Sequence, residues 1–244
     1  MLASPTPSER PHRTSSGTSW AALVGGSPLL RLRQSGDGRV LLKLEGGQAS
    51  GSYWDRLVAA QFGRLAADEA VGFSGRHGHS VAVAAYARAT GRQAFMLAET
   101  VDEPRLESLL GSYGLPVVEE LPAGAVLLER DDEEAHRRAF AGWLAEFPSE
   151  PSVLVLPAFA GLVEAVEAVA PERRVVWVED DGEMRRTLSE DAACRRTQVA
   201  HREGLLLSPL GAELVDAGVA AAVHGATQVI VLVPEGGQRH LGWW

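Results

Sequence analysis

The sequence predicts an α/β protein built on parallel β-sheet. Short apolar runs alternate with helical patterns from residue 40 to residue 119, an order typical of strand–helix–strand units with right-handed crossovers. Apolar segments of strand length recur later in the chain, over residues 153–156, 174–178 and 228–233. We expect all of these strands to be buried, with helices on both faces of the sheet.

The individual elements follow from hydrophobic periodicity and from turn residues. A Ser-Gly-Asp-Gly turn at residues 35–38 leads into the apolar run Val40–Leu44, which reads as the first buried strand. The further strands of the first half are predicted over residues 71–73, 94–97 and 116–118. Helices are predicted over residues 53–68, 79–90, 103–112 and 189–202, with an amphipathic helix inside 126–147 and another opening at 157–161.

A Gly/Ser-rich turn, Glu45–Ser52, separates the first strand from the first helix. Backbone N–H groups in such a turn, together with the dipole of the following helix, favour a small anion. The turn therefore predicts a site for an anionic ligand.

This segment resembles the lysine segment of the cysteine synthase and cystathionine β-synthase family. In that family a strand ending in Lys-Leu-Glu leads to Asn-Pro-Ser-Gly-Ser-Val-Lys-Asp-Arg, and the lysine of the second motif holds pyridoxal phosphate (PLP) as an imine. Here Lys43–Glu45 and Gly51–Arg56 carry the matching pattern, but Trp54 stands at the lysine position. The resemblance implies a fold-type II, tryptophan synthase β-like architecture of two parallel-sheet lobes.

Four other segments resemble the same family in the correct order, so the likeness extends from residue 24 to residue 241. The turn Ser74–Gly78 is similar to the family's Ser-Gly-Asn-Thr-Gly, which holds the substrate carboxylate, with Arg76 and His77 in place of Asn and Thr. The remaining segments are 24–32, 202–212 and 234–241. The chain is shorter than a family member, and the spacing indicates losses between 119 and 152 and between 180 and 188.

The groups that anchor PLP in the family are replaced in this sequence. Trp54 removes the imine-forming lysine, and Pro157–Gly161 stands where the family has a glycine- and threonine-rich phosphate loop. Pro209 and Leu210 replace the serines that meet the pyridine end of the cofactor. Because a PLP enzyme must anchor and orient its cofactor, we expect that PLP is not bound. The alternative is a PLP imine on Lys43, which is the only lysine of the chain.

Composition restricts the partners and the location. The chain has 244 residues and a formal net charge of −9, which argues against nucleic acid and against an anionic membrane surface as partners. No stretch resembles a transmembrane span or a signal peptide. The only cysteine, Cys194, supports no intrachain disulfide and no cysteine-based metal site, which indicates a reducing cytoplasm.

The sequence further predicts how the chain is divided. Residues 1–18, rich in Ser, Pro, Thr and Arg, are expected to form a mobile arm. Residues 19–241 are expected to form one fold-type II-like unit. Its smaller lobe, approximately residues 40–125, is inserted into a larger lobe formed by 19–39 and 126–241.

Two classes of function remain open. The first is a cysteine synthase-like pseudoenzyme without PLP, a structural or regulatory partner that forms a dimer or other homo-oligomer, or a hetero-oligomer with an active homologue or pathway enzyme. Apolar replacements such as Trp54 and Leu210 are what a filled cofactor cavity requires. The second is a PLP-independent enzyme acting on a small amino-acid-like carboxylate, as in specialised metabolism; a PLP-dependent lyase or transferase is not expected.

The candidate ligand residues follow from the two turns. A carboxylate or other small anion is expected to be held by Ser74, Arg76 and His77, with Ser50 and Ser52 facing it. If the chain is an enzyme, it is expected to use this turn together with His79, and His77 is the candidate catalytic residue. No metal is expected, because His77 and His79 stand at a helix start without an evident third ligand.

Overall fold

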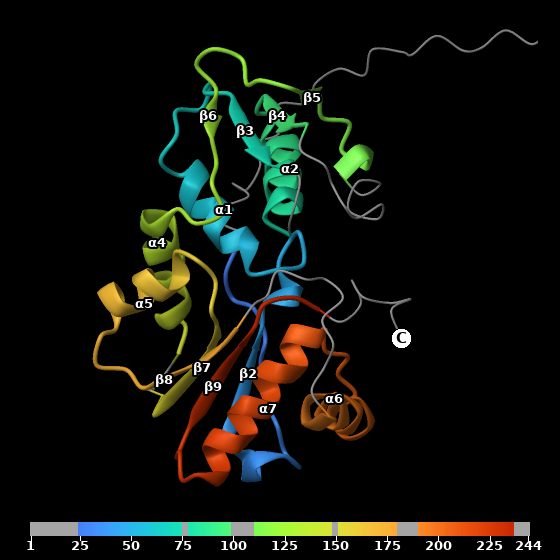
Figure 1. Ribbon diagram of the computed structural model, residues 1–244, viewed down its shortest axis with the longest axis vertical. Helices are drawn as coiled ribbons and strands as arrows, with labels where there is room; N and C mark the ends of the chain where they lie inside the picture. Colours follow the sequence, from blue (N-terminus) through green and yellow to red (C-terminus); the bar gives the residue numbers. More distant parts are fainter. Residues whose placement is uncertain (1–23, 75–77, 99–109, 148–150, 180–189, 237–244) are drawn as a thin grey trace, which may run out of the picture.

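The structure is a computed structural model that describes residues 24–74, 78–98, 110–147, 151–179 and 190–236 (Figure 1). Several predictions fall outside these ranges. They concern the arm of residues 1–18, most of the helix 103–112, the segment 180–188 where residues were expected to be lost relative to the family, and the end of the unit predicted to close at residue 241. Two β-sheets, one above the other in Figure 1, organise the described chain.

The larger sheet contains five strands, of which the central ones are entirely apolar apart from Lys43. Its order is β1 (Leu29–Arg31), β2 (Val40–Leu44), β9 (Val229–Val233), β7 (Val153–Pro157) and β8 (Val175–Val178). The edge strand β1 is antiparallel to β2, and all other pairs are parallel.

The smaller sheet contains four short parallel strands. Its order is β5 (Val117–Val118), β4 (Ala94–Leu97), β3 (Val71–Ser74) and β6 (Val126–Leu127). In both sheets the parallel strands bring their carboxyl ends to one edge, which is where open α/β sheets place ligands.

Helices cover both faces of the larger sheet. On one face lie α6 (Glu190–Glu203) and α7 (Pro209–Val223), and α7 packs across β2, β7 and β9. On the other face lie α4 (Glu133–Leu144) and α5 (Leu162–Val169) (Figure 1). Helix α1 (Trp54–Phe62) packs against both α4 and α2 (Gly78–Thr90), so α1 joins the large sheet's helical layer to the smaller sheet.

The strand alternation divides the core in two. Along β7, Leu154 and Leu156 face the cluster that includes α1, α4 and α5, whereas Val153 and Val155 face the cluster beneath α7. The same alternation holds along β2 and β9. A central strand with two buried faces must be apolar at every position, which explains the continuous hydrophobic runs in the sequence.

The predicted α/β fold is therefore confirmed, and Val153–Leu156 is fully buried as expected. Two predicted strands form without being buried. In β5, Val117 is 57% exposed, and all four residues of β8 are half-buried. Both strands lie at sheet edges, where only one neighbour covers them.

The predicted boundary of the smaller lobe needs correction. Strand β2 was placed in that lobe, but it pairs with β1 and β9 in the larger sheet, so the smaller lobe begins after residue 44. Strand β6 lies in the smaller sheet although its residues were placed in the larger lobe. Its pairing with β3 spans only two residues, too few for a recognisable sequence pattern.

Three further differences concern single elements. The helix predicted over 53–68 ends at Phe62, because the Gly63 N–H closes the last turn on Ala59 and the chain then turns away. No element was predicted over α7 or β1, although Ser208 followed by proline is a helix start signal. The short 3-10 turns η2 (Gly36–Gly38) and η3 (Glu45–Gly47) flank β2.

A buried network of charged side chains ties α1 to the larger sheet. Arg56 donates to the Glu45 carboxylate over 2.8 Å and to the Glu146 carboxylate over 2.6 Å. Lys43 lies 2.5 Å from the second oxygen of Glu146 and donates to the carbonyl of Ser27. The Ser27 hydroxyl completes the network by donating to Glu45 over 2.7 Å.

Charge balance makes this network tolerable inside the protein. Glu45 is fully buried, and Lys43 and Arg56 are 3% and 5% exposed. Burial by itself would raise the pKa of Glu146, but hydrogen bonds from Arg56 and Lys43 outweigh it and hold that pKa below its usual range. Two cations and two carboxylates thus compensate one another, and removing one leaves a buried charge without its partner.

We predict that Arg56→Met lowers the free energy of unfolding by about 3–5 kcal/mol, because Glu45 then keeps a buried negative charge without its cation. Urea denaturation measures the change. The matched control is Arg138→Met, since Arg138 is 54% exposed and pairs with Glu134 one turn away on α4, a contact worth at most about 0.5 kcal/mol. Similar losses in the two variants would contradict this interpretation of the network.

Candidate functional site

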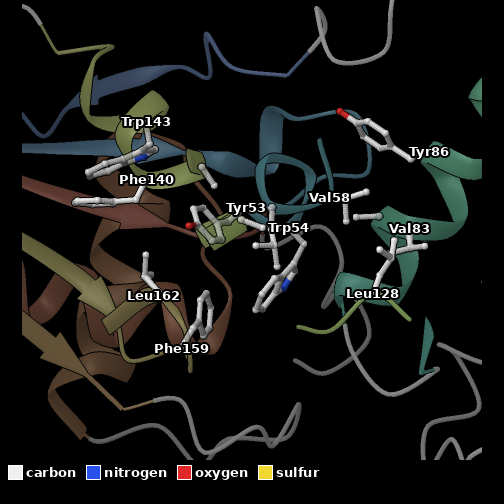
Figure 2. Close-up of a cluster of buried hydrophobic side chains, with 14 of the residues drawn as sticks. Tyr53, Trp54, Val58, Val83, Tyr86, Leu128, Phe140, Trp143, Phe159 and Leu162 are labelled. Carbon is white, nitrogen blue, oxygen red and sulfur yellow. The ribbon is translucent and has the colours of Figure 1, made fainter. Parts of the chain in front are cut away.

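Trp54, the first residue of α1, is buried at the junction of the two sheets and is 7% exposed. Its indole lies 4.7 Å from the Phe159 ring, measured between centroids, at an interplanar angle of 32°. Figure 2 shows the two side chains close together, with Tyr53 beside them. The rings of His79 and His136 meet the indole edgewise at 6.0 and 6.2 Å. Packed aromatic rings therefore surround the position at which the family resemblance places the imine-forming lysine.

Three amide groups of the loop between β7 and α5 are hydrogen-bonded to the protein itself rather than left for a ligand. The Gly161 N–H donates to the carboxylate of Glu164 over 3.0 Å, and the Phe159 N–H donates to the Pro157 carbonyl over 2.9 Å. The Leu162 N–H donates to the Phe159 carbonyl over 3.1 Å. A carboxylate at the start of α5 already uses the favourable end of the helix dipole.

The same loop is covered by the segment that precedes α4. Gly161 has φ of +79°, and a Cβ atom there would stand 2.8 Å from the Asp131 carbonyl oxygen and 2.6 Å from the His136 ring. Glycine is needed at this position for both its backbone conformation and its lack of a side chain. The start of α5 is thus closed by protein atoms.

The segment at the start of α7 is equally self-contained. Ser208 is fully buried, and its hydroxyl caps the helix by accepting from the Gly211 N–H over 3.0 Å. Pro209 occupies the first helical position, where its missing N–H costs nothing. Leu210 packs against both hydrophobic clusters.

Two amide groups of the Gly/Ser turn after β2, those of Ser50 and Ser52, are not free, contrary to the prediction. The Asp55 carboxylate, fully buried, accepts from the Ser50 N–H over 3.0 Å and from the Ser52 N–H over 3.3 Å. The Ser50 hydroxyl donates to the same carboxylate over 2.7 Å. The anion that this turn favours is supplied by the chain itself.

A cavity of about 430 Å³ lies at the carboxyl edges of the parallel strands. Ser74 at the end of β3, His79 and Ser80 in the first turn of α2, and Ala160 after β7 contribute to its wall. The segment after β6 supplies the rest together with Leu97, namely Leu127, Leu128, Glu129, Arg130 and Asp131. Of the predicted ligand residues, Ser74 lines this cavity, whereas Ser50 and Ser52 are not among its lining residues. Arg76 and His77 lie outside the described residues.

Two buried histidines flank this region; His79 was expected to take part in the carboxylate site, whereas His136 was not predicted as a site residue. His79 is 3% exposed and its Nε2 lies 3.0 Å from the side-chain oxygen of Gln61. His136 is fully buried, its Nε2 lies 2.9 Å from the Arg130 carbonyl oxygen, and burial lowers its pKa. In the sequence, His136 stands beside Ala135 in an amphipathic helix. Gln61, the partner of His79, fits the apolar periodicity of α1. Both residues therefore resembled ordinary core positions.

The described residues contain no group of three His, Cys, Asp or Glu side chains placed to hold a metal ion. Among the helices that the structure describes, none combines the length and the hydrophobicity needed to cross a membrane.

The two-sheet arrangement defines the class of fold as that of cysteine synthase-like α/β proteins. O-ureido-L-serine synthase superposes with a TM-score of 0.70 over 92% of this chain and 93% of that chain, at 18% identity. A lysine-to-alanine mutant of O-ureido-L-serine synthase, bound to O-ureido-L-serine, gives the same score and identity over 93% and 92%.

Cysteine synthase from Entamoeba histolytica superposes with a TM-score of 0.69 over 99% of this chain and 92% of that chain, at 14% identity. No protein-family model and no curated protein matches the sequence. At these identities the likeness establishes the fold, and the predicted cysteine synthase-like architecture is confirmed.

We predict that Gly161→Ala destabilises the protein by more than about 2 kcal/mol, because it combines a strained backbone with a collision against the Asp131 carbonyl. Gly204→Ala is the matched control, since Gly204 has φ of +70° but nothing within 4 Å of an added Cβ. The control carries only the backbone cost of about 1–2 kcal/mol. Thermal unfolding of both variants separates the two contributions, and equal shifts would mean that the start of α5 is open.

Proposed function

We propose that this protein is a cysteine synthase-like pseudoenzyme that does not use PLP and acts as a structural or regulatory partner. The observation that carries the proposal is the burial of the Trp54 indole against Phe159, 4.7 Å between ring centroids. An indole cannot form an imine with an aldehyde, whereas a lysine amine can. The side chain at this position fills space and supplies no nucleophile.

The state of Lys43 supports the same conclusion. An amine must be able to reach an aldehyde before it can form an imine with it. Lys43 is 3% exposed, pairs with Glu146 and donates to the Ser27 carbonyl. Its amine therefore stabilises the fold, and the PLP imine on Lys43 is the weaker alternative.

The remaining anchors of PLP do not fit the cofactor either. A phosphate needs free N–H donors, but the Gly161 N–H is bonded to Glu164, and the Phe159 and Leu162 N–H groups are bonded to carbonyl groups of the same loop. The carboxylate of Glu164 would repel a phosphate group at the same helix start. At the pyridine end, Pro209 and Leu210 provide no hydroxyl group.

A role as a partner protein would explain why the chain keeps the cysteine synthase-like fold without the residues that anchor PLP. The partner that we propose is a second copy of this chain, in a dimer, or an active homologue or pathway enzyme in a cytoplasmic hetero-oligomer. Size-exclusion chromatography, alone and after mixing with an active cysteine synthase homologue, tests this part of the proposal. A monomer that joins no such complex would contradict it.

The cavity between the sheets favours a second candidate, a PLP-independent enzyme acting on a small carboxylate. Ser74 and His79 line this cavity, and Arg76 and His77 lie between them in the sequence. The two candidates differ in what Arg76→Ala and His77→Ala do. Lost cellular function at unchanged thermal stability favours the enzyme, and unchanged function favours the pseudoenzyme.

We predict that the protein, purified from cells that make PLP, shows no visible absorption band of a lysine imine. Addition of PLP should also produce no such band, because the anchoring groups are absent. The control is an active cysteine synthase homologue purified in the same way. A protein-bound chromophore that disappears in Lys43→Ala would overturn the proposed loss of cofactor.

A further inference from the structure

The charged run Glu129–Glu134 is expected from sequence to be a solvated helix start, but the structure divides it into two functional parts. The second half serves α4. Asp132 accepts from the Ala135 N–H over 3.0 Å as the helix cap and pairs with Arg64. Glu134 pairs with Arg138 over 2.9 Å. These charges stabilise the helix and its neighbours.

The first half of the run faces the cavity instead. Glu129, Arg130 and Asp131 all line it, and within the described part of the chain none of the three forms an ion pair. Three charged residues therefore lie at one cavity, with Arg130 half-buried and Glu129 and Asp131 exposed at its rim, and none of them is paired within the described residues. Such an arrangement favours a charged ligand, because a complementary charge placed among these groups gains Coulomb attraction.

The backbone of this segment is held in place from beneath. The side-chain amide of Gln61, which is fully buried, donates to the Glu129 carbonyl over 2.6 Å. The ring nitrogen Nε2 of buried His136 lies 2.9 Å from the Arg130 carbonyl oxygen. Two consecutive carbonyl groups are thus fixed by buried side chains, which is the kind of support that a preformed binding site needs.

The Arg130 side chain has a platform of its own. Its guanidinium carbon lies 5.7 Å from the centroid of the Trp54 indole, within the range of a cation–π contact. Trp54 is buried and packed on Phe159, so the platform is rigid. A guanidinium stacked on a ring keeps its N–H edge available for two parallel hydrogen bonds to a carboxylate.

The charges on the cavity wall define the chemistry of the ligand. One cation and two carboxylates give the segment a net charge of −1, so the complementary ligand carries one anionic group and two cationic groups. The formal net charge of −9 on the whole chain also favours a net positive ligand. A cavity of about 430 Å³ suits a small molecule.

We propose that this cavity binds a small basic zwitterion non-covalently, with its carboxylate on Arg130 and its cationic groups on Glu129 and Asp131. The inference rests on the proposed function, because the Trp54 indole that replaces the imine-forming lysine is also the platform for Arg130. It adds a ligand class and three recognition residues to the pseudoenzyme.

Isothermal titration calorimetry with three related probes tests the charge pattern. L-Arginine carries one carboxylate and two cationic groups, L-citrulline lacks the guanidinium charge, and agmatine lacks the carboxylate. We expect L-arginine to bind at least about tenfold more tightly than either analogue, because each analogue leaves one charged wall residue without its partner.

Variants assign the charges to residues. Arg130→Gln is expected to weaken L-arginine at least about tenfold while changing agmatine little, because agmatine has no carboxylate to lose. The double variant Glu129→Gln/Asp131→Asn is expected to weaken L-arginine while changing L-citrulline less. Arg138→Gln, an exposed arginine on α4 outside the cavity lining, is the matched control and should bind like the wild type.

The inference is overturned if L-arginine gives no binding, if L-citrulline or agmatine binds equally well, or if Arg130→Gln has no effect. Absorption spectra of the same samples keep this failure separate from that of the proposed function. A lysine imine band would count against the loss of PLP, whereas absent binding without any such band would count against the zwitterion site alone.

Discussion

The contact between the Trp54 indole and the Phe159 ring is the constraint on which the account of this site depends. It joins the start of α1 to the loop after β7, two segments more than 100 residues apart in sequence. Because both rings are buried, they exclude water and ligands from the space between them. The same indole supports Arg130 through a cation–π contact, so one side chain both fills the core and positions a charged group.

Several charged side chains near the predicted cofactor position bind other groups of the protein and so are not available to a ligand. Lys43, Glu164 and Asp55 each bind a group of the protein itself: a carboxylate, a helix N-terminus and a turn. Each contact stabilises the fold locally and removes a donor or acceptor from any ligand. On the segment before α4, by contrast, Glu129, Arg130 and Asp131 form no ion pair with the described residues, and the proposed ligand is placed there for that reason.

Much of the fold could be predicted from sequence because a buried parallel strand leaves a continuous apolar run, as in β7 and β9. Edge strands such as β5 and the two-residue β6 leave a weaker pattern. The predicted burial of β5 was therefore wrong, and the pairing of β6 with the smaller sheet was missed. For the site, Trp54 was identified through a motif. Arg130 and Gln61 were not identified. Gln61 acts through a hydrogen bond to Glu129, 68 positions away, and Arg130 acts through its contact with the Trp54 ring. No local sequence pattern encodes contacts between residues so far apart.

The measurement that tests the central claim most directly is borohydride reduction of the protein in the presence of PLP, followed by peptide mass mapping. Reduction converts an imine into a stable covalent adduct, and the chain offers one lysine, Lys43, besides its terminal amine. The account predicts that the Lys43 peptide carries no PLP adduct in the folded protein. A stoichiometric adduct on Lys43, lost after denaturation before PLP is added, would contradict it.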